Sequence, residues 1–252
     1  MSYVIMPTES YQTLCDKLRE KTGGTDNLVA SDIPDIIKTF GSAETLEAYL
    51  EGTLTSYSND RITKIGAQVF RNITTLTNVH LPYVTSVGES AFRGCTKLTT
   101  VNAPNITSTG TQAFSGCTKL SSIEVTLFKT ISTQAFYNCG FTTLNFPNVT
   151  TINTQGVRNC KKLTKVDLGS VATINAYSFD SCSLLETLII RTGKICTLGN
   201  TNALSNTPIQ NGTGYIYVPS ALVESYKVAT NWATYVNQFR TIEDYPEICG
   251  EA

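Results

Sequence analysis

The chain has 252 residues, of which 41% are hydrophobic and only 15% are charged, well below the roughly 25% of an average globular protein. The formal net charge is -1, from 19 basic and 20 acidic residues, and the absence of a basic stripe argues against nucleic-acid binding. Residues 1–7 lack the basic flank of a secretory signal, and no apolar run approaches the roughly 18 residues that a membrane helix needs. We therefore expect a soluble product made in the cytosol, without membrane association.

Residues 1–52 differ from the rest of the chain, because their apolar residues recur at helical spacing. Three short helices are predicted: one after the capping residue Thr8, one after Ser31 and Asp32, and one after Ser42 that ends at Gly52. Their apolar faces carry Tyr11, Leu14, Cys15 and Leu18, then Ile33, Ile36, Ile37 and Phe40, then Leu46, Tyr49 and Leu50. These faces are too small to form a domain, so we expect the segment to cover the start of the region that begins at residue 53 or to dock onto a partner.

From residue 62 to residue 190 the chain repeats itself about every 22 residues, after a first expected strand at residues 53–58. The copies begin at Ile62, Val84, Ile106, Phe128, Val149 and Val171. A phenylalanine recurs as Phe70, Phe92, Phe114, Phe136 and Phe179, with Val157 in the fifth copy, and a cysteine recurs as Cys95, Cys117, Cys139, Cys160 and Cys182, with Ile73 in the first. A fixed period in this range predicts a leucine-rich-repeat solenoid.

Each copy is expected to hold a strand, a second short strand and a short helical turn. In the second copy Val101 and Ala103 should face the core, Thr85 to Val87 should form the second strand, and residues 89–94 should form the helical turn around Phe92. Thr109 replaces the usual Ile or Val and should loosen packing locally. The equally spaced cysteines should stack as small buried hydrophobes. Disulfides and a metal site are the alternatives: the equal spacing argues against disulfides, and the cysteines lack the close-paired spacing of zinc sites.

The repeat decays after residue 190, and residues 196–209 read as a degenerate copy with Leu204 near the phenylalanine position. A turn at 210–214, a strand at 215–219 and a helix capped by Ser220 come next. The aromatic tail, with the single Trp232, is expected to seal the last repeat, although an aromatic ligand site remains an alternative. We therefore divide the chain into a helical segment (1–52), a solenoid (53–209) and a C-terminal cap (210–252).

Strand alternation defines an outward row of side chains, which is the predicted partner-binding surface. The row consists of Asn78, His80, Thr100, Asn102, Ser122, Glu124, Thr143, Asn145, Lys165, Asp167, Thr187 and Ile189. It is rich in hydroxyl and amide groups, which suits hydrogen bonds to a glycan or a protein backbone. It lacks aromatic rings for sugar stacking, so contacts at the edges or caps are an equal alternative.

The copy from Val84 to Pro104, with its Gly-x-x-Ala-Phe-x-Gly-Cys-Thr-x-Leu core, resembles the BspA-like bacterial leucine-rich repeats. The resemblance covers residues 53–190, and residues 215–226 with Asn231-Trp232-Ala233 look like that family's usual ending. It implies a right-handed solenoid, mainly β with short helical turns, found in bacterial surface adhesins and in phages of gut Firmicutes. Residues 14–26 and 32–37 also look like the leader of tail-associated proteins in such phages.

No catalytic constellation is visible, since the single histidine, His80, has no predicted nucleophile or orienting carboxylate beside it. Glu243 and Asp244 are expected in a solvated tail. We expect no enzyme activity, no cofactor and no metal. The favoured hypothesis is a phage virion protein, tail- or baseplate-associated, that contacts other virion proteins through its N-terminal segment and a host surface protein or glycan through the solenoid, with self-association left open. The alternative is a bacterial cell-surface or secreted adhesin.

Overall fold

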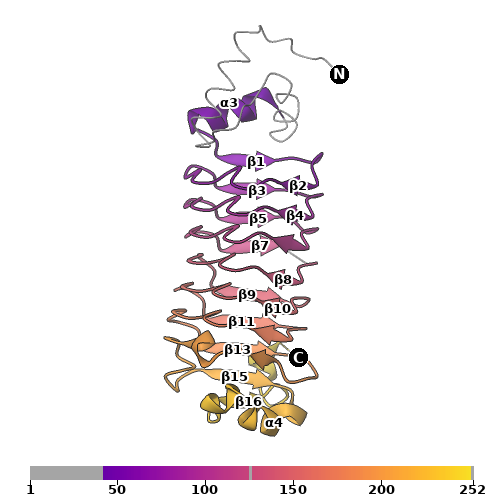
Figure 1. Ribbon diagram of the computed structural model, residues 1–252, viewed down its shortest axis with the longest axis vertical. Helices are drawn as coiled ribbons and strands as arrows, with labels where there is room; N and C mark the ends of the chain where they lie inside the picture. The colour runs from indigo at the N-terminus through magenta and orange to yellow at the C-terminus, as the bar shows by residue number, and fades with distance from the viewer. Residues whose placement is uncertain (1–41, 125–126, 251–252) are drawn as a thin grey trace.

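The chain winds into an elongated parallel β-solenoid whose turns stack along the long axis (Figure 1). The computed structural model describes residues 42–124 and 127–250. Equivalent strands of successive repeats pair in parallel and in register, as at Val79 and Val101. The predicted repeat solenoid, mainly β, is confirmed, whereas the helices expected near residues 8–22 and 32–40 lie outside the described residues.

The longer strands form one side of the solenoid in two sheets that succeed each other along its axis. The first sheet contains β1 (Ser56–Ser58), β3 (Asn78–His80), β5 (Thr100–Asn102) and β7 (Ser122–Glu124). The second contains β9 (Thr143–Phe146), β11 (Lys165–Leu168), β13 (Thr187–Ile190), β15 (Tyr215–Val218) and β16 (Phe239–Thr241). The strand predicted at residues 215–219 therefore continues the sheet, and β16 adds a further rung.

Two-residue strands form another side of each turn. They are β2 (Lys64–Ile65), β4 (Ser86–Val87) and β6 (Ser108–Thr109), then β8 (Thr130–Ile131), β10 (Thr151–Ile152), β12 (Thr173–Ile174) and β14 (Thr197–Leu198). The pairing of β14 with β12 and the full burial of Leu204 confirm the degenerate seventh copy.

The segment around each phenylalanine is a chain of turns, not the helical turn that we predicted. In the second copy Ser90 and Gly94 both have positive φ, 53° and 75°, a conformation that interrupts a helix. The backbone N–H of Phe92 instead donates to the carbonyl of Ala113 in the next repeat, at 2.8 Å. Because the same bond recurs along the solenoid, this third side is also a continuous hydrogen-bonded ladder.

Phenylalanine rings fill the core, one in most repeats. Phe92 and Phe114 are fully buried, and their ring centroids lie 5.3 Å apart with planes 2° from parallel. Phe70 and Phe136 extend the stack on either side. Val157 is buried at the same position in the fifth copy and ends the stack. The inward assignment of this column is therefore confirmed.

The strand sides are interrupted between the third and fourth copies, where β7 and β9 belong to different sheets, as do β6 and β8. In the fourth copy, the segment between the cysteine and the next inward strand residue is one residue shorter than in the third. Leu144 follows Cys139 after five positions, whereas Ile123 follows Cys117 after six. The turn ladder crosses the interruption, with the Phe114 N–H 2.9 Å from the Ala135 carbonyl. At β6 the buried hydroxyl of Thr109 has no hydrogen-bond partner among the described residues, in keeping with the weaker packing expected there.

Each end of the described solenoid is covered. The helix α3 (Ala43–Glu51) is capped by Ser42, whose hydroxyl accepts from the Thr45 N–H, and it ends at Gly52 with φ 74°. Leu46 and Tyr49 are buried against the first turn, as predicted. Beyond β15 lie the short helices η3 (Ser220–Leu222), α4 (Val223–Val228) and η4 (Trp232–Tyr235), whereas η2 (Thr201–Leu204) precedes β15 and α5 (Pro246–Cys249) follows β16.

The C-terminal cap satisfies the open edge of β14 with side chains. The Cys196 N–H donates to the Tyr226 hydroxyl at 2.8 Å, Trp232 Nε1 donates to the Cys196 carbonyl at 2.6 Å, and Asn231 Nδ2 donates to the Leu198 carbonyl at 2.7 Å. An edge strand otherwise offers a template for aggregation, so these residues seal the stack. Ser220 does not cap α4 as predicted; its N–H and hydroxyl donate to Glu243.

Candidate functional site

The outward row exists as two parallel columns of side chains along the strand side. Strand register places His80 beside Asn102 and Asn102 beside Glu124, and farther along it places Asn145 beside Asp167 and Asp167 beside Ile189. The other column runs through Asn78, Thr100 and Ser122, and then through Thr143, Lys165 and Thr187. The structure therefore brings all twelve predicted residues onto one side of the molecule, in two groups separated by the break between β7 and β9.

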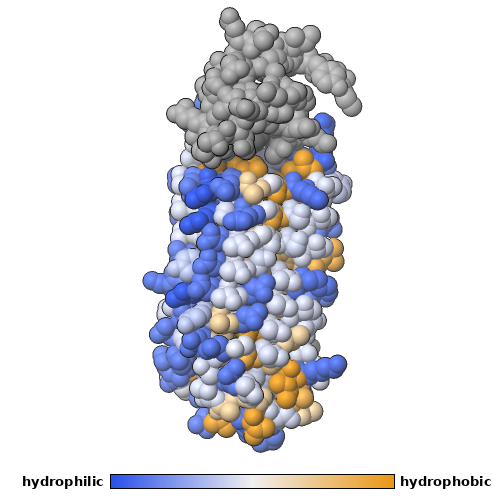
Figure 2. Space-filling model, viewed as in Figure 1, coloured by the Kyte–Doolittle hydropathy of each residue, from blue (hydrophilic) through white to orange (hydrophobic). Residues whose placement is uncertain are grey.

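Side chains of the first group are exposed, except for the half-buried Asn102, and two pairs of them are hydrogen-bonded across the strands. The Thr100 hydroxyl donates to Asn78 Oδ1 at 2.7 Å, and Asn102 Nδ2 donates to Glu124 Oε2 at 2.6 Å. Figure 2 shows mostly polar and near-neutral residues over the middle of the visible face, with apolar patches near its ends and at one side. These bonds orient groups that otherwise face solvent, which lowers the entropy lost on binding a partner.

Sequence reasoning missed three outward residues that extend the row. Tyr215 pairs with Thr187, Tyr217 with Ile189, and Arg240 with Tyr217 in register. The Arg240 guanidinium lies 4.2 Å from the centre of the Tyr215 ring. The twelve predicted residues lack aromatic rings, as expected, but the extension on β15 adds Tyr215, which is half-buried, and Tyr217, which is buried. The alternation of Tyr215-Ile216-Tyr217-Val218 indicates which side chains of this strand face outward. Because we assigned the strand to a separate cap, we did not include these residues in the row.

The C-terminal segment folds back onto the outward face at β13 and β15. We call residues 243–250 the C-terminal strap. Ile189 is completely buried, in a cluster with Tyr217, Ile242 and Cys249 against which Ile248 packs. Ile189 therefore faces outward as predicted but does not reach solvent, because the strap covers it.

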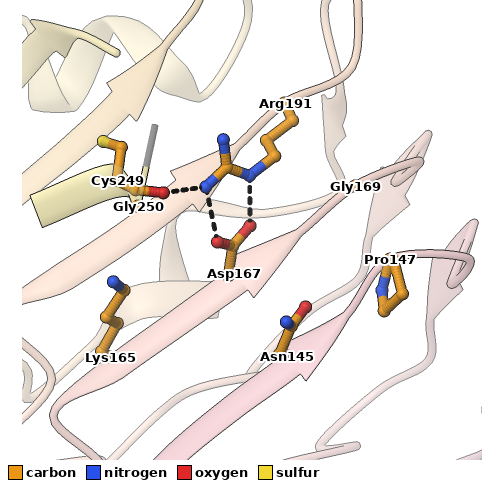
Figure 3. A pocket seen from close by; sticks show the side chains of 8 residues that line it. All are labelled: Asn145, Pro147, Lys165, Asp167, Gly169, Arg191, Cys249 and Gly250. Atoms are coloured by element: carbon orange, nitrogen blue, oxygen red, sulfur yellow. Dashed lines mark hydrogen bonds and ion pairs between the residues drawn. The ribbon is translucent and has the colours of Figure 1, made fainter. Parts of the chain in front are cut away.

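Charged groups of the row meet the strap in a surface hollow of about 420 Å³ (Figure 3). Arg191 makes two hydrogen bonds to Asp167, from Nε to Oδ1 and from Nη2 to Oδ2, both at 2.8 Å. Arg191 Nη2 also donates to the Cys249 carbonyl, and Lys165 Nζ donates to the Ile248 carbonyl. Asn145 and the backbone at Pro147, Gly169 and Gly250 complete the lining. The hollow thus presents amide, carboxylate and cationic groups around the main chain of the strap.

The cysteines form a buried column as predicted. Cys95, Cys117, Cys139, Cys160 and Cys182 are free thiols, and each donates to the carbonyl of the phenylalanine-position residue in the preceding repeat. Burial raises the pKa of Cys117 and Cys139 above the usual value, and the neighbouring Cys160 thiol, together with burial, raises that of Cys182. Thiols held protonated are poor nucleophiles, so this column is built for packing.

Within residues 42–124 and 127–250, no group of three or more His, Cys, Asp or Glu side chains is placed to hold a metal ion. Within the same residues, no helix has the length and apolar character to cross a membrane. His80 is exposed on the row, next to Asn102 and Ser58 in register.

The repeat matches a known family over residues 51–155 and 126–222, described as the BspA type leucine rich repeat region, with six copies. The chain belongs to the BspA-type leucine-rich repeat family. No curated protein is similar enough to this family member to be counted as a relative.

Solved structures share the fold. A leucine-rich repeat protein from Bacteroides ovatus ATCC 8483 is 25% identical, with a TM-score of 0.52 over 66% of this chain, and this BspA-type chain spans only 52% of that protein. A leucine-rich repeat protein of T. pallidum is 20% identical, with a TM-score of 0.51, over 68% of this chain and 80% of its own. The second likeness concerns the fold alone.

Proposed function

We propose that this BspA-type solenoid is a non-catalytic binding protein that contacts a partner macromolecule through its outward row. The observation that carries the proposal is the pair of polar columns on β3, β5 and β7, in which cross-strand hydrogen bonds join Thr100 to Asn78 and Asn102 to Glu124. Solenoids present extended surfaces to partners, and a row of amides, hydroxyls and a carboxylate suits a glycan or a protein backbone. Tyr215, which is half-buried, adds a ring on which a sugar can stack, whereas Tyr217 is buried.

The setting that the family favours is a bacterial cell-surface or secreted adhesin. The chain matches the BspA-type repeat model, and the solved structure with a TM-score of 0.52 is a leucine-rich repeat protein from Bacteroides ovatus. In this setting the outward row contacts a host or neighbouring-cell surface.

A phage virion protein is the second candidate. It is supported by the resemblance of residues 14–26 and 32–37 to leaders of tail-associated phage proteins, and those residues lie outside the described structure. In this setting residues 1–52 dock onto another virion protein and the solenoid contacts the host. Mass spectrometry of purified virions, together with the identity of neighbouring genes, separates the two settings: capsid and tail genes beside this one and the chain in the particle support the virion, and their absence supports the adhesin.

The binding role is tested with a triple variant, His80→Ala, Asn102→Ala and Glu124→Ala, which removes one continuous column. The matched control is Thr96→Ala, Thr118→Ala and Lys119→Ala, three exposed residues on the loops that come after Cys95 and Cys117. Labelled wild type and both variants are applied to a panel of immobilised glycans and to a surface-displayed peptide library. For each glycan or peptide that binds wild type, we expect the affinity of the column variant to be at least about tenfold lower. The control variant should bind with the affinity of wild type. A folded column variant that binds like wild type would move the site off this face.

A further inference from the structure

The strap is packed as a unit distinct from the solenoid core. Its buried contacts form a small cluster of Ile189, Tyr217, Ile242 and Cys249, separate from the continuous core that holds the phenylalanine rings. The helix α5 within it has four residues, far fewer than the roughly 12 that an isolated helix needs in water. The conformation of the strap therefore depends on the face beneath it, and its release leaves the solenoid core intact.

The contacts that hold the strap are those of peptide recognition. Lys165 and Arg191 donate to the main-chain carbonyls of Ile248 and Cys249, which are groups that every polypeptide offers. Side chains add selectivity, since the Tyr245 ring meets the Tyr217 ring edge to face at 5.5 Å. Ile248 packs three residues farther on, in the cluster around Ile189.

Charge on the two sides is complementary. The strap carries Glu243, Asp244 and Glu247 and no basic residue. The face beneath and beside it carries Lys165, Arg191 and Arg240, and the carboxylate that lines the hollow, Asp167, is engaged by Arg191 at 2.8 Å. A cationic face with tyrosines under an acidic segment has the character of a site for acidic peptides.

We propose that β11, β13 and β15 form a peptide-binding site, and that the strap is its intramolecular occupant, released when a partner takes its place. The partner is an acidic polypeptide segment with a tyrosine and, three residues later, an aliphatic side chain, as in Tyr245-Pro246-Glu247-Ile248. The strap thereby keeps Ile189 and Tyr217 covered until that partner is present. This inference rests on the proposed binding role of the outward face and assigns a partner class to one end of it.

The test uses the full chain with the strap weakened by Ile248→Asp. The probe is a fluorescent peptide of residues 243–250 that carries Cys249→Ser. Fluorescence anisotropy is expected to show binding at least about tenfold tighter to the folded variant than to wild type, because the wild-type strap competes for the same site. Adding Lys165→Ala to the variant should weaken the peptide at least about tenfold, and a scrambled peptide should not bind. A folded variant that does not bind, or equal binding to wild type and variant, would overturn the proposal.

Thiol labelling of wild type gives a second measurement that does not depend on how well the variant folds. Cys249 lies in the strap and Cys160 in the solenoid column, and both are buried. If the strap opens without the solenoid, mass spectrometry should find Cys249 alkylated at least about 100-fold faster than Cys160 under native conditions. Equal rates would show that the strap is a fixed part of the solenoid. Because the column variant on β3, β5 and β7 tests the binding role elsewhere, a failure of one experiment does not decide the other.

Discussion

The Cys117 thiol donates a hydrogen bond to the backbone carbonyl of Phe92 in the preceding repeat, with sulfur and oxygen 3.1 Å apart. The same relation recurs at every cysteine of the column, from Cys95 to Cys182. The residue is therefore more than a small hydrophobe. It fills the core and also donates a second hydrogen bond to the Phe92 carbonyl, which accepts the Cys95 N–H at 3.2 Å within its own repeat. The thiol therefore links one repeat to the next.

Replacing Cys117 by alanine should lower the free energy of unfolding by about 0.5–1.5 kcal/mol, because the Phe92 carbonyl loses one of its two donors and keeps only the Cys95 N–H. Cys117→Ser keeps a donor at nearly the same place and should cost less. Denaturant unfolding of both variants measures the difference. If alanine and serine are equally damaging, the thiol hydrogen bond contributes nothing to stability.

Stability should fall as the pH rises above about 9. Burial raises the pKa of Cys117 and Cys139 above the usual 9.0, and the Cys160 thiol raises that of Cys182. The unfolded chain releases these protons while the folded chain keeps them, so each thiol should cost about 1.4 kcal/mol per pH unit above 9. Urea unfolding between pH 7 and 10 measures the slope. A variant with alanine at all three positions should show a flatter profile, and identical profiles would contradict this account.

Phe114→Ala should cost about 3–5 kcal/mol, the usual range for a buried phenylalanine. Phe114 stacks on rings at both sides, 5.3 Å from Phe92 and 5.6 Å from Phe136, so the cavity reaches two neighbouring repeats. The control is Tyr83→Ala, since Tyr83 is 59% exposed and should change stability by less than about 0.5 kcal/mol. Equal melting curves for the two variants would mean that the inward register is wrong.

Trp232→Phe keeps an aromatic ring in the cap but removes the Nε1–H that donates to the Cys196 carbonyl. We expect a loss of about 1–3 kcal/mol from the unsatisfied carbonyl, and light scattering on mild heating should show earlier aggregation because the edge of β14 is less well sealed. Val228→Ala, at a position 82% exposed, is the control and should behave like wild type.

Much of the solenoid could be predicted from the sequence, because its repeat ties each residue type to one environment. The columns of Phe92 and Cys95, the alternation at Val101 and the cap of α3 at Ser42 all arise from local pattern. The turns around Phe92 could not be read in this way. The backbone hydrogen bonds of these turns join one repeat to the next. The spacing of apolar residues in this segment suits a helix, but the backbone instead forms a ladder between repeats.

The strap also lay beyond sequence reasoning. The burial of Ile189 depends on a segment that returns across some 50 positions of chain, and nothing near Ile189 signals it. The sequence could have placed Tyr215 and Tyr217 in the outward row. That prediction requires the strand repeat to continue past the turn at Gly212. Tertiary contacts determine where a short segment docks, and local sequence propensity does not predict those contacts.

A footprint of the outward row shows directly whether a bound partner covers it. Asn102→Cys and, as control, Thr96→Cys are each alkylated with and without the best binder found on the glycan or peptide panel. We expect the binder to slow alkylation at position 102 at least about tenfold, as burial in an interface does, and to leave alkylation at position 96 unchanged. Equal alkylation at position 102 with and without a saturating binder would contradict the assignment of this face as the contact surface.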